Sequence, residues 1–200
     1  MEQKFHVIHK YIPEASINLV ENLLEKYAFN LIIKNNRKTK HGDFRPLPNG
    51  FYQITINNDL NIYRFVITLV HEIAHLKTFK EQKKRVKPHG IEWKLNFQHL
   101  MLPFLNLAIF PKEILILLAQ YLRNPKASTD SDIQLSLALK GYDEKTNKNF
   151  IFEIPMHSKF THNNRTFIKG NKRRVRYKCM EISSKKEYLF HPNAEVDLVF

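Results

Sequence analysis

The sequence predicts an α+β protein, in which a helical core with a short β-sheet is followed by a small C-terminal β unit. Two hydrophobic patterns lead to this expectation. Apolar residues recur at helical spacing up to about residue 122, and with a period of two beyond residue 132. A chain of 200 residues with 43% hydrophobic and 12% aromatic residues can bury such a core, which argues against global disorder.

The first part of the chain combines one helix with two strands. Pro13 opens a helical pattern whose apolar positions end at Tyr27. The segments 29–35 and 51–57 are typical of strands, because β-branched and aromatic residues dominate them. The basic stretch 35–50 between them is rich in turn residues, so it is expected to form a loop.

Three further helices are expected after the second strand. The residues "NND" at 57–59 offer N-caps for a long helix from about Leu60 to Phe79. A second helix is expected to start near Ile91, and a third to run from Pro111 to about Leu122.

The domain boundary is expected after the third of these helices. Residues 1–123 form the predicted first domain, residues 124–132 have linker composition, and residues 133–200 form a small, basic, β-rich domain. The strands of this second domain are expected at 133–139, 150–154, 166–182 and 194–200.

The composition favours a polyanionic partner inside the cell. With 32 Lys and Arg against 19 Asp and Glu, the net charge is +13, which favours nucleic acid before an acidic membrane surface.

Cys179 is the single cysteine, so no intrachain disulfide can form. The N-terminus lacks the apolar region of a signal peptide, and the uncharged stretch 95–111 is too short and too polar to span a bilayer. A cytoplasmic protein without membrane association is therefore expected.

The segment "TLVHEIAHLKTF", residues 68–79, contains an H-E-x-x-H motif. Residues i and i+4 share one face of a helix, so His71 and His75 can bind one ion. Glu72 lies about 100° around the helix axis, where it could reach a water molecule without ligating the metal. The alternative is a core helix that carries two histidines, but buried imidazoles would then need other partners.

The segment "KPHGIEWK" offers the third ligand that a catalytic zinc requires. Pro88 and Gly90 bracket His89, which predicts a tight turn that presents this imidazole at the start of the next helix. Glu92 is the rival ligand, although an acid there could instead complement the helix macrodipole. Trp93 is expected in the core. The metzincin pattern requires a glycine and a histidine within the next few residues. The segment "LKTFKEQ" follows the motif instead, so this pattern is excluded. One Zn²⁺ per chain is expected, with His71, His75 and His89 as ligands and Glu72 as the catalytic residue.

"LVHEIAHL" followed by "PHGIEWK", together with "KHGDFR" and "YQITIN", resembles the SprT-like zinc metalloproteases, the family that includes Spartan-type proteins, over about residues 10–123. The resemblance implies a zincin-like metalloprotease core, zinc at the positions of His71, His75 and His89, and a catalytic base at Glu72. It also implies a zinc endopeptidase that associates with DNA and acts on DNA-bound or DNA-crosslinked proteins. Many bacterial members end in a zinc ribbon with four cysteines. This chain has only Cys179, so residues 133–200 stand at the position of a degenerate ribbon.

Two basic stretches are candidate DNA contacts, one at 77–87 and one at 157–178. Such contacts address phosphates, and the expected partner is single-stranded or distorted DNA. The alternative for each stretch is a solvated surface. The candidate residues are Lys83, Lys84, Arg85, Lys87, Lys172, Arg173, Arg174 and Arg176.

Two other functions compete with the endopeptidase. One is a nucleic-acid-binding module with a structural or vestigial zinc site, against which Glu72 argues, because a structural site has no use for that carboxylate. The other is a metal hydrolase that acts on a nucleic acid or a small amide, which only the family resemblance disfavours. Tyr63 and the basic residues of 77–87 are candidates for stabilising an oxyanion.

Overall fold

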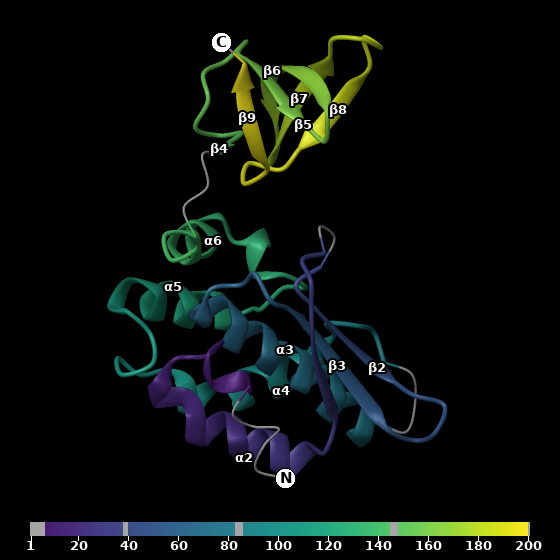
Figure 1. Ribbon diagram of the computed structural model, residues 1–200, viewed down its shortest axis with the longest axis vertical. Coiled ribbons are helices and arrows are strands. Elements are labelled where there is room, and N and C mark those ends of the chain that lie inside the picture. Colours follow the sequence, from purple (N-terminus) through teal and green to yellow (C-terminus); the bar gives the residue numbers. More distant parts are fainter. Residues whose placement is uncertain (1–6, 38–39, 83–85, 145–147, 200) are drawn as a thin grey trace. The chain divides into compact units, whose positions relative to one another are not determined.

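The computed structural model describes residues 7–37, 40–82, 86–144 and 148–199. The chain divides into an N-terminal unit, residues 1–143, and a C-terminal unit, residues 144–200 (Figure 1). The first combines helices with a sheet and the second contains a sheet, which confirms the α+β class. Within the described ranges, no helix has the length and apolar character needed to cross a membrane.

The sheet of the N-terminal unit has the order β1-β3-β2. The central strand β3 pairs in parallel with β1 and antiparallel with β2. The strands are β1 (Asn30–Lys34), β2 (Gly42–Pro46) and β3 (Tyr52–Asn57). The strands expected at 29–35 and 51–57 are thus confirmed.

Strand β2 was missed, because the whole of 35–50 reads as a loop. The chain reverses at the far end of this stretch, where the backbone N–H of Leu47 donates to the carbonyl oxygen of Phe51 at 2.8 Å and Gly50 adopts a φ of 79°. Gly50 supplies the left-handed conformation that closes the β2–β3 hairpin.

The helices of the N-terminal unit agree with the sequence pattern up to residue 122. They are η1 (Glu14–Ser16), α2 (Ile17–Tyr27), α3 (Ile62–Glu81), α4 (Ile91–Met101), η2 (Leu102–Phe104), α5 (Lys112–Leu122), η3 (Thr129–Ser131) and α6 (Ile133–Lys140). Helix α3 follows β3 directly and packs on β2, β3 and α4. Twelve of its 20 residues are buried, more than the single stripe of an ordinary surface helix, so α3 is the centre of the unit.

The predicted linker and first C-terminal strand are wrong. The boundary between the units lies at 143/144, and the segments 124–132 and 133–139 belong to the N-terminal unit. The polar residues that suggest a linker are caps: the side chain of Asp132 accepts a hydrogen bond from the backbone of Leu135 and starts α6. Leu135 and Leu139 are buried at i and i+4, a spacing that alternating apolar residues also satisfy.

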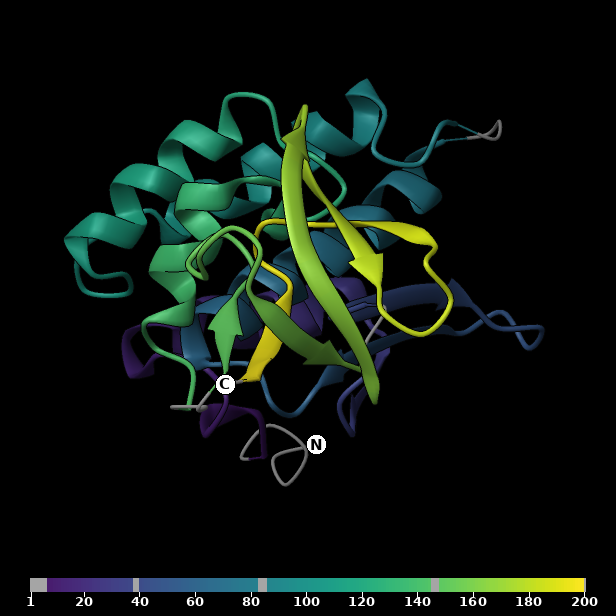
Figure 2. The same ribbon diagram turned by 90° about the horizontal axis from the view of Figure 1, so that it is seen from above.

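The C-terminal unit is a sheet in the order β4-β9-β5-β6-β7-β8 (Figures 1 and 2). Its strands are β4 (Asn149–Phe150), β5 (Lys159–His162), β6 (Arg165–Arg173), β7 (Arg176–Glu181), β8 (Glu187–Phe190) and β9 (Glu195–Val199). The strand expected at 150–154 is limited to β4, and the segment 166–182 is a hairpin instead of one strand. The core includes Phe160, Phe167 and Cys179.

Asn61 fixes the start of α3. Its side-chain oxygen accepts hydrogen bonds from the backbone of Tyr63 (3.1 Å) and Arg64 (2.9 Å). Its amide nitrogen donates to the carbonyl oxygen of Leu139 at 2.8 Å and to Asp143 Oδ1 at 2.5 Å. One side chain therefore caps α3 and ties it to the end of α6.

We expect Asn61→Ala to lower the free energy of unfolding by about 1–2 kcal/mol, because both the cap and the tie are lost. Urea denaturation followed by circular dichroism measures this. Asn58→Ala is the control, since Asn58 is exposed and makes one long side-chain contact of 3.4 Å, and it should change stability by less than about 0.5 kcal/mol. Equal effects of the two substitutions would contradict the role of Asn61.

Candidate metal centre

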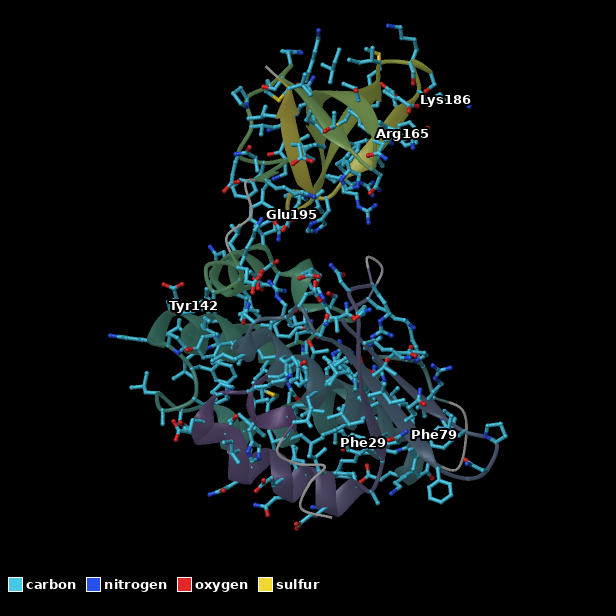
Figure 3. All side chains as sticks on the ribbon, viewed as in Figure 1. Phe29, Phe79, Tyr142, Arg165, Lys186 and Glu195 are labelled. Atoms are coloured by element: carbon cyan, nitrogen blue, oxygen red, sulfur yellow. The ribbon has the colours of Figure 1, made fainter. Side chains whose placement is uncertain are left out.

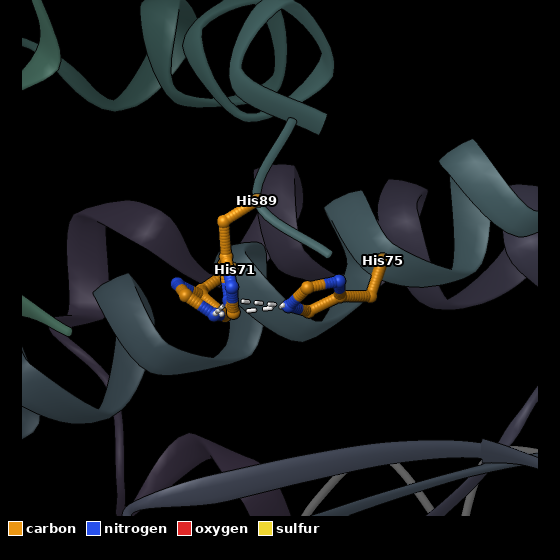
Figure 4. Close-up of side chains that lie close together, drawn as sticks. All are labelled: His71, His75 and His89. Carbon is orange, nitrogen blue, oxygen red and sulfur yellow. Dashed lines mark hydrogen bonds between the residues drawn. The ribbon is translucent and has the colours of Figure 1, made fainter. Parts of the chain in front are cut away.

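Three imidazoles from two segments of the N-terminal unit converge (Figure 4). His71 and His75 lie one turn apart on α3, as the motif predicts. His89 precedes α4 in the turn Pro88–His89–Gly90, where the backbone N–H of Gly90 donates to the carbonyl oxygen of Lys87 at 2.9 Å. His89 has a φ of 56°, a left-handed conformation that is uncommon for a side-chain-bearing residue. The predicted tight turn is confirmed.

The three Nε2 atoms form a nearly equilateral triangle. They are 3.2 Å apart between His71 and His75, 3.0 Å between His75 and His89, and 3.3 Å between His89 and His71. A neutral imidazole nitrogen either donates a proton or offers a lone pair. In a ring of three contacts at least two nitrogens are of the same kind, so the three contacts cannot all be hydrogen bonds. A shared cation satisfies all three lone pairs at once.

The triangle fits zinc. Zn–N bonds of about 2.0–2.1 Å in a tetrahedral arrangement separate the nitrogens by about 3.3 Å. Burial lowers the pKa of His71 well below 6.5 and that of His75 to about 3, and neighbouring imidazoles add to both effects. Burial also lowers the pKa of His89. The three rings are therefore neutral at pH 7, so each has a lone pair that can coordinate a metal ion.

Trp93 supports all three rings. It is 1% exposed, and its ring centroid lies 4.6 Å from that of His71, 5.3 Å from that of His75 and 4.6 Å from that of His89. Its indole nitrogen donates to the carbonyl oxygen of His71 at 3.4 Å. The expected core position is confirmed, and the contacts add a role in orienting the imidazoles.

Glu72 is held beside the triangle at a close contact between α3 and β2. Its side chain is 6% exposed, and a Cβ atom on Gly42 would lie 2.7 Å from its Oε1 atom. Only a glycine lets the strand pass so near the carboxyl group. Burial, and then the charge of Asp43, raise the pKa of Glu72 to about 8, although a hydrogen bond from the Phe44 backbone and the charges of Lys40 and Arg37 oppose this.

Two pockets adjoin the site. We call the first the polar pocket; it has a volume of about 220 Å³ and is lined by Arg37, Lys40, His41, His71, Glu72 and Asp130, among others. We call the second the apolar pocket; it has a volume of about 560 Å³ and its lining includes Phe44, His75, Phe79, Val86, His89 and Trp93. Phe79, labelled in Figure 3, is 50% exposed. His71 thus lines the polar pocket together with Glu72, and His75 and His89 line the apolar pocket.

Two sequence candidates lie away from the triangle. Within the described residues, Glu92 is not part of the three-imidazole cluster and lies in the first turn of α4, which suits its interpretation as an acid near a helix N-terminus. Tyr63 packs against Phe110 and Tyr142 at the start of α3 and lines neither of these two pockets.

One of the basic candidates lines a pocket of the site. Lys87 is exposed and lines the apolar pocket. Lys83, Lys84 and Arg85 lie outside the described residues. Lys77, the first lysine of this basic stretch, forms an ion pair of 2.8 Å with Glu81, so its charge is compensated. Lys172, Arg173, Arg174 and Arg176 are exposed around the turn of the β6–β7 hairpin, where Arg174 has a φ of 55°.

Sequence reasoning missed the residues of the polar pocket. Gly42 lies within the "KHGDFR" that contributed to the family resemblance, but its contact with Glu72 could not be read from it. His41, Arg64 and Asp130 form a charged cluster in which Asp130 Oδ2 lies 2.6 Å from His41 Nε2 and Asp130 Oδ1 lies 2.7 Å from Arg64 Nη1. No spacing of residues in the sequence predicts these contacts, because they join segments that are far apart in the chain.

The raised pKa of Glu72 makes the stability of the metal-free protein depend on pH. The folded state holds this proton more tightly than the unfolded chain, so the stabilisation is complete below pH 4.5 and is lost as the pH rises to about 8. Glu72→Gln keeps a neutral group at every pH. We expect the variant to gain stability relative to wild type over this pH range, by about 5 kcal/mol, in urea denaturation with a chelator present. Glu25→Gln, at an exposed position of α2, is the control. Parallel pH profiles of Glu72→Gln and wild type would contradict the buried, proton-binding state.

Comparisons with known protein families, with curated proteins and with solved structures found no match to this chain.

Proposed function

We propose that the protein is a zinc-dependent endopeptidase that acts on proteins bound or crosslinked to DNA. The observation that carries the proposal is the triangle of Nε2 atoms with the carboxyl group of Glu72 buried beside it. The resemblance to SprT-like proteases supplies the substrate class, and the net charge of +13 is compatible with a DNA partner.

The number of ligands favours a catalytic over a structural zinc. Structural sites are closed by four protein ligands, whereas catalytic sites have three and leave one position open. Within the described residues the cluster holds three imidazoles and no fourth His, Cys, Asp or Glu. Both pockets reach these imidazoles, so a substrate has space to approach.

Each residue of the site has its own role in the proposed hydrolysis. A zinc ion held by His71, His75 and His89 would polarise the scissile carbonyl and make water a better nucleophile. Glu72 accepts a proton from the attacking water as the new C–O bond forms. It then delivers this proton to the nitrogen as the C–N bond breaks. Trp93 holds the imidazoles in place.

The direct test combines zinc content with proteolysis of casein and of a DNA-crosslinked protein, with and without single-stranded DNA. We expect about one zinc per chain in wild type and in Glu72→Gln. Cleavage should fall at least about 100-fold in Glu72→Gln, because the general base is lost, and should persist in the control Glu25→Gln. Zinc binding without cleavage of either substrate under any DNA condition would contradict the endopeptidase and favour the binding module.

The exposed hairpin tip of the C-terminal unit carries one group of the proposed DNA contacts. Reversing the charges of Arg173, Arg174 and Arg176 should weaken binding to single-stranded DNA and reduce the slope of log K against log salt by roughly 2, as lost phosphate contacts release fewer counterions. Fluorescence anisotropy at several salt concentrations measures this. The control reverses three exposed charges of the N-terminal unit, Lys26, Lys34 and Lys112. Equal losses in both variants would mean that net charge alone, and not the hairpin tip, governs binding.

A further inference from the structure

Arg37 is fixed at the polar pocket by neutral acceptors. Its Nε atom donates to Asn57 Oδ1 at 2.7 Å, and its Nη1 atom donates to Thr55 Oγ1 at 2.8 Å. Its Nη2 atom lies 3.4 Å from the carbonyl oxygen of Thr55. Both acceptor residues are buried on β3, the central strand. These bonds orient the guanidinium group but leave its charge uncompensated.

The other cations around this pocket have acidic partners. Lys40 Nζ lies 2.8 Å from Asp43 Oδ1, and Arg64 Nη1 lies 2.7 Å from Asp130 Oδ1. No carboxylate lies within ion-pair distance of Arg37 in the part of the chain that the structure describes.

The balance of charge in the pocket therefore depends on Arg37 and Glu72. The carboxyl group of Glu72 is the one acid of the polar pocket without an ion pair among the described residues. With a zinc ion on the three imidazoles, positive charge exceeds the single negative charge of Glu72. The loaded site would thus attract an anion to a place directly beside the hydrolytic residues.

We propose that Arg37 makes the polar pocket a binding site for an acidic side chain, an Asp or Glu of the substrate close to the scissile peptide bond. A guanidinium group has five N–H donors, of which three are engaged, so two remain for the oxygens of a carboxylate. The volume of about 220 Å³ is below the roughly 300–1,000 Å³ of pockets that hold drug-sized ligands, which fits one side chain better than a nucleotide. The inference rests on the proposed function, because it takes the substrate to be a peptide chain.

Binding tests the inference without catalysis. The zinc-loaded Glu72→Gln protein is titrated with fluorescent peptides of one sequence, in which a single Glu or Gln is moved through each position. At one position we expect the Glu peptide to bind about tenfold more tightly than the Gln peptide. Adding Arg37→Gln should bring this ratio to about one, and Arg37→Lys to about threefold, because lysine retains the charge without the planar fork. Arg45→Gln is the control, since Arg45 is exposed on β2 and does not line the pocket.

Each outcome decides the inference. Equal affinity of Glu and Gln peptides at every position, or a preference that persists in Arg37→Gln, would overturn it. If Arg37→Gln does not fold, an unchanged ratio in Arg37→Lys overturns it instead. Arg37-dependent binding of a short oligonucleotide that is tighter than binding of any Glu peptide would also overturn it, in favour of a phosphate.

Cleavage by the wild-type protein separates the inference from the proposed function. Peptides cleaved at equal rates with Glu and with Gln at every position, and bound with equal affinity, would leave the endopeptidase standing and remove the carboxylate site. Arg37-dependent binding of the Glu peptide without cleavage of any peptide or protein would support the carboxylate site and remove the endopeptidase.

Discussion

The mutual approach of three imidazole nitrogens is the constraint on which the rest of the site depends. Three donors or acceptors within 3.0–3.3 Å of one another cannot all be satisfied by hydrogen bonds, so the arrangement favours a shared cation. The protein holds the arrangement with rigid parts: a largely buried helix, a tryptophan in contact with each ring, and a turn in which His89 adopts a left-handed backbone conformation. Metal affinity and the stability of this region are expected to be coupled for the same reason.

The contact between β2 and α3 places a carboxyl group beside the candidate metal centre. Gly42 lets the strand pass close to Glu72, which buries the carboxyl group and places it in the lining of the polar pocket. Burial keeps the proton on Glu72 in the metal-free chain, whereas a nearby dication would favour the carboxylate. A metal ion bound at the imidazoles would therefore promote the loss of the proton from Glu72. Arg37 and Lys40, whose charges lower the pKa of Glu72, act in the same direction as the metal.

Local signals in the sequence predicted the helices of the first 122 residues and the buried position of Trp93. They also predicted the two segments that carry the three imidazoles. Helical spacing sets His71 beside His75, and Pro88 and Gly90 mark the turn that delivers His89. The failures involve ambiguous or non-local patterns. Alternating leucines in 133–139 satisfy both a strand and a helix, and only the cap at Asp132 decides for α6. The polar pocket brings together residues far apart in the chain, such as Asp130 with Arg64, 66 positions away, and with His41, 89 positions away.

The proposed function requires one zinc ion that is bound by three imidazoles and keeps an open coordination position. X-ray absorption spectroscopy of the zinc-loaded protein tests it most directly, because it reports the type and number of the ligands around the metal. We expect three imidazole nitrogens at about 2.0–2.1 Å, one further light atom from water, and no sulfur. His89→Ala should lose one imidazole from the spectrum, or lose the metal. Sulfur in the coordination sphere, or an unchanged spectrum in His89→Ala, would rule out this site.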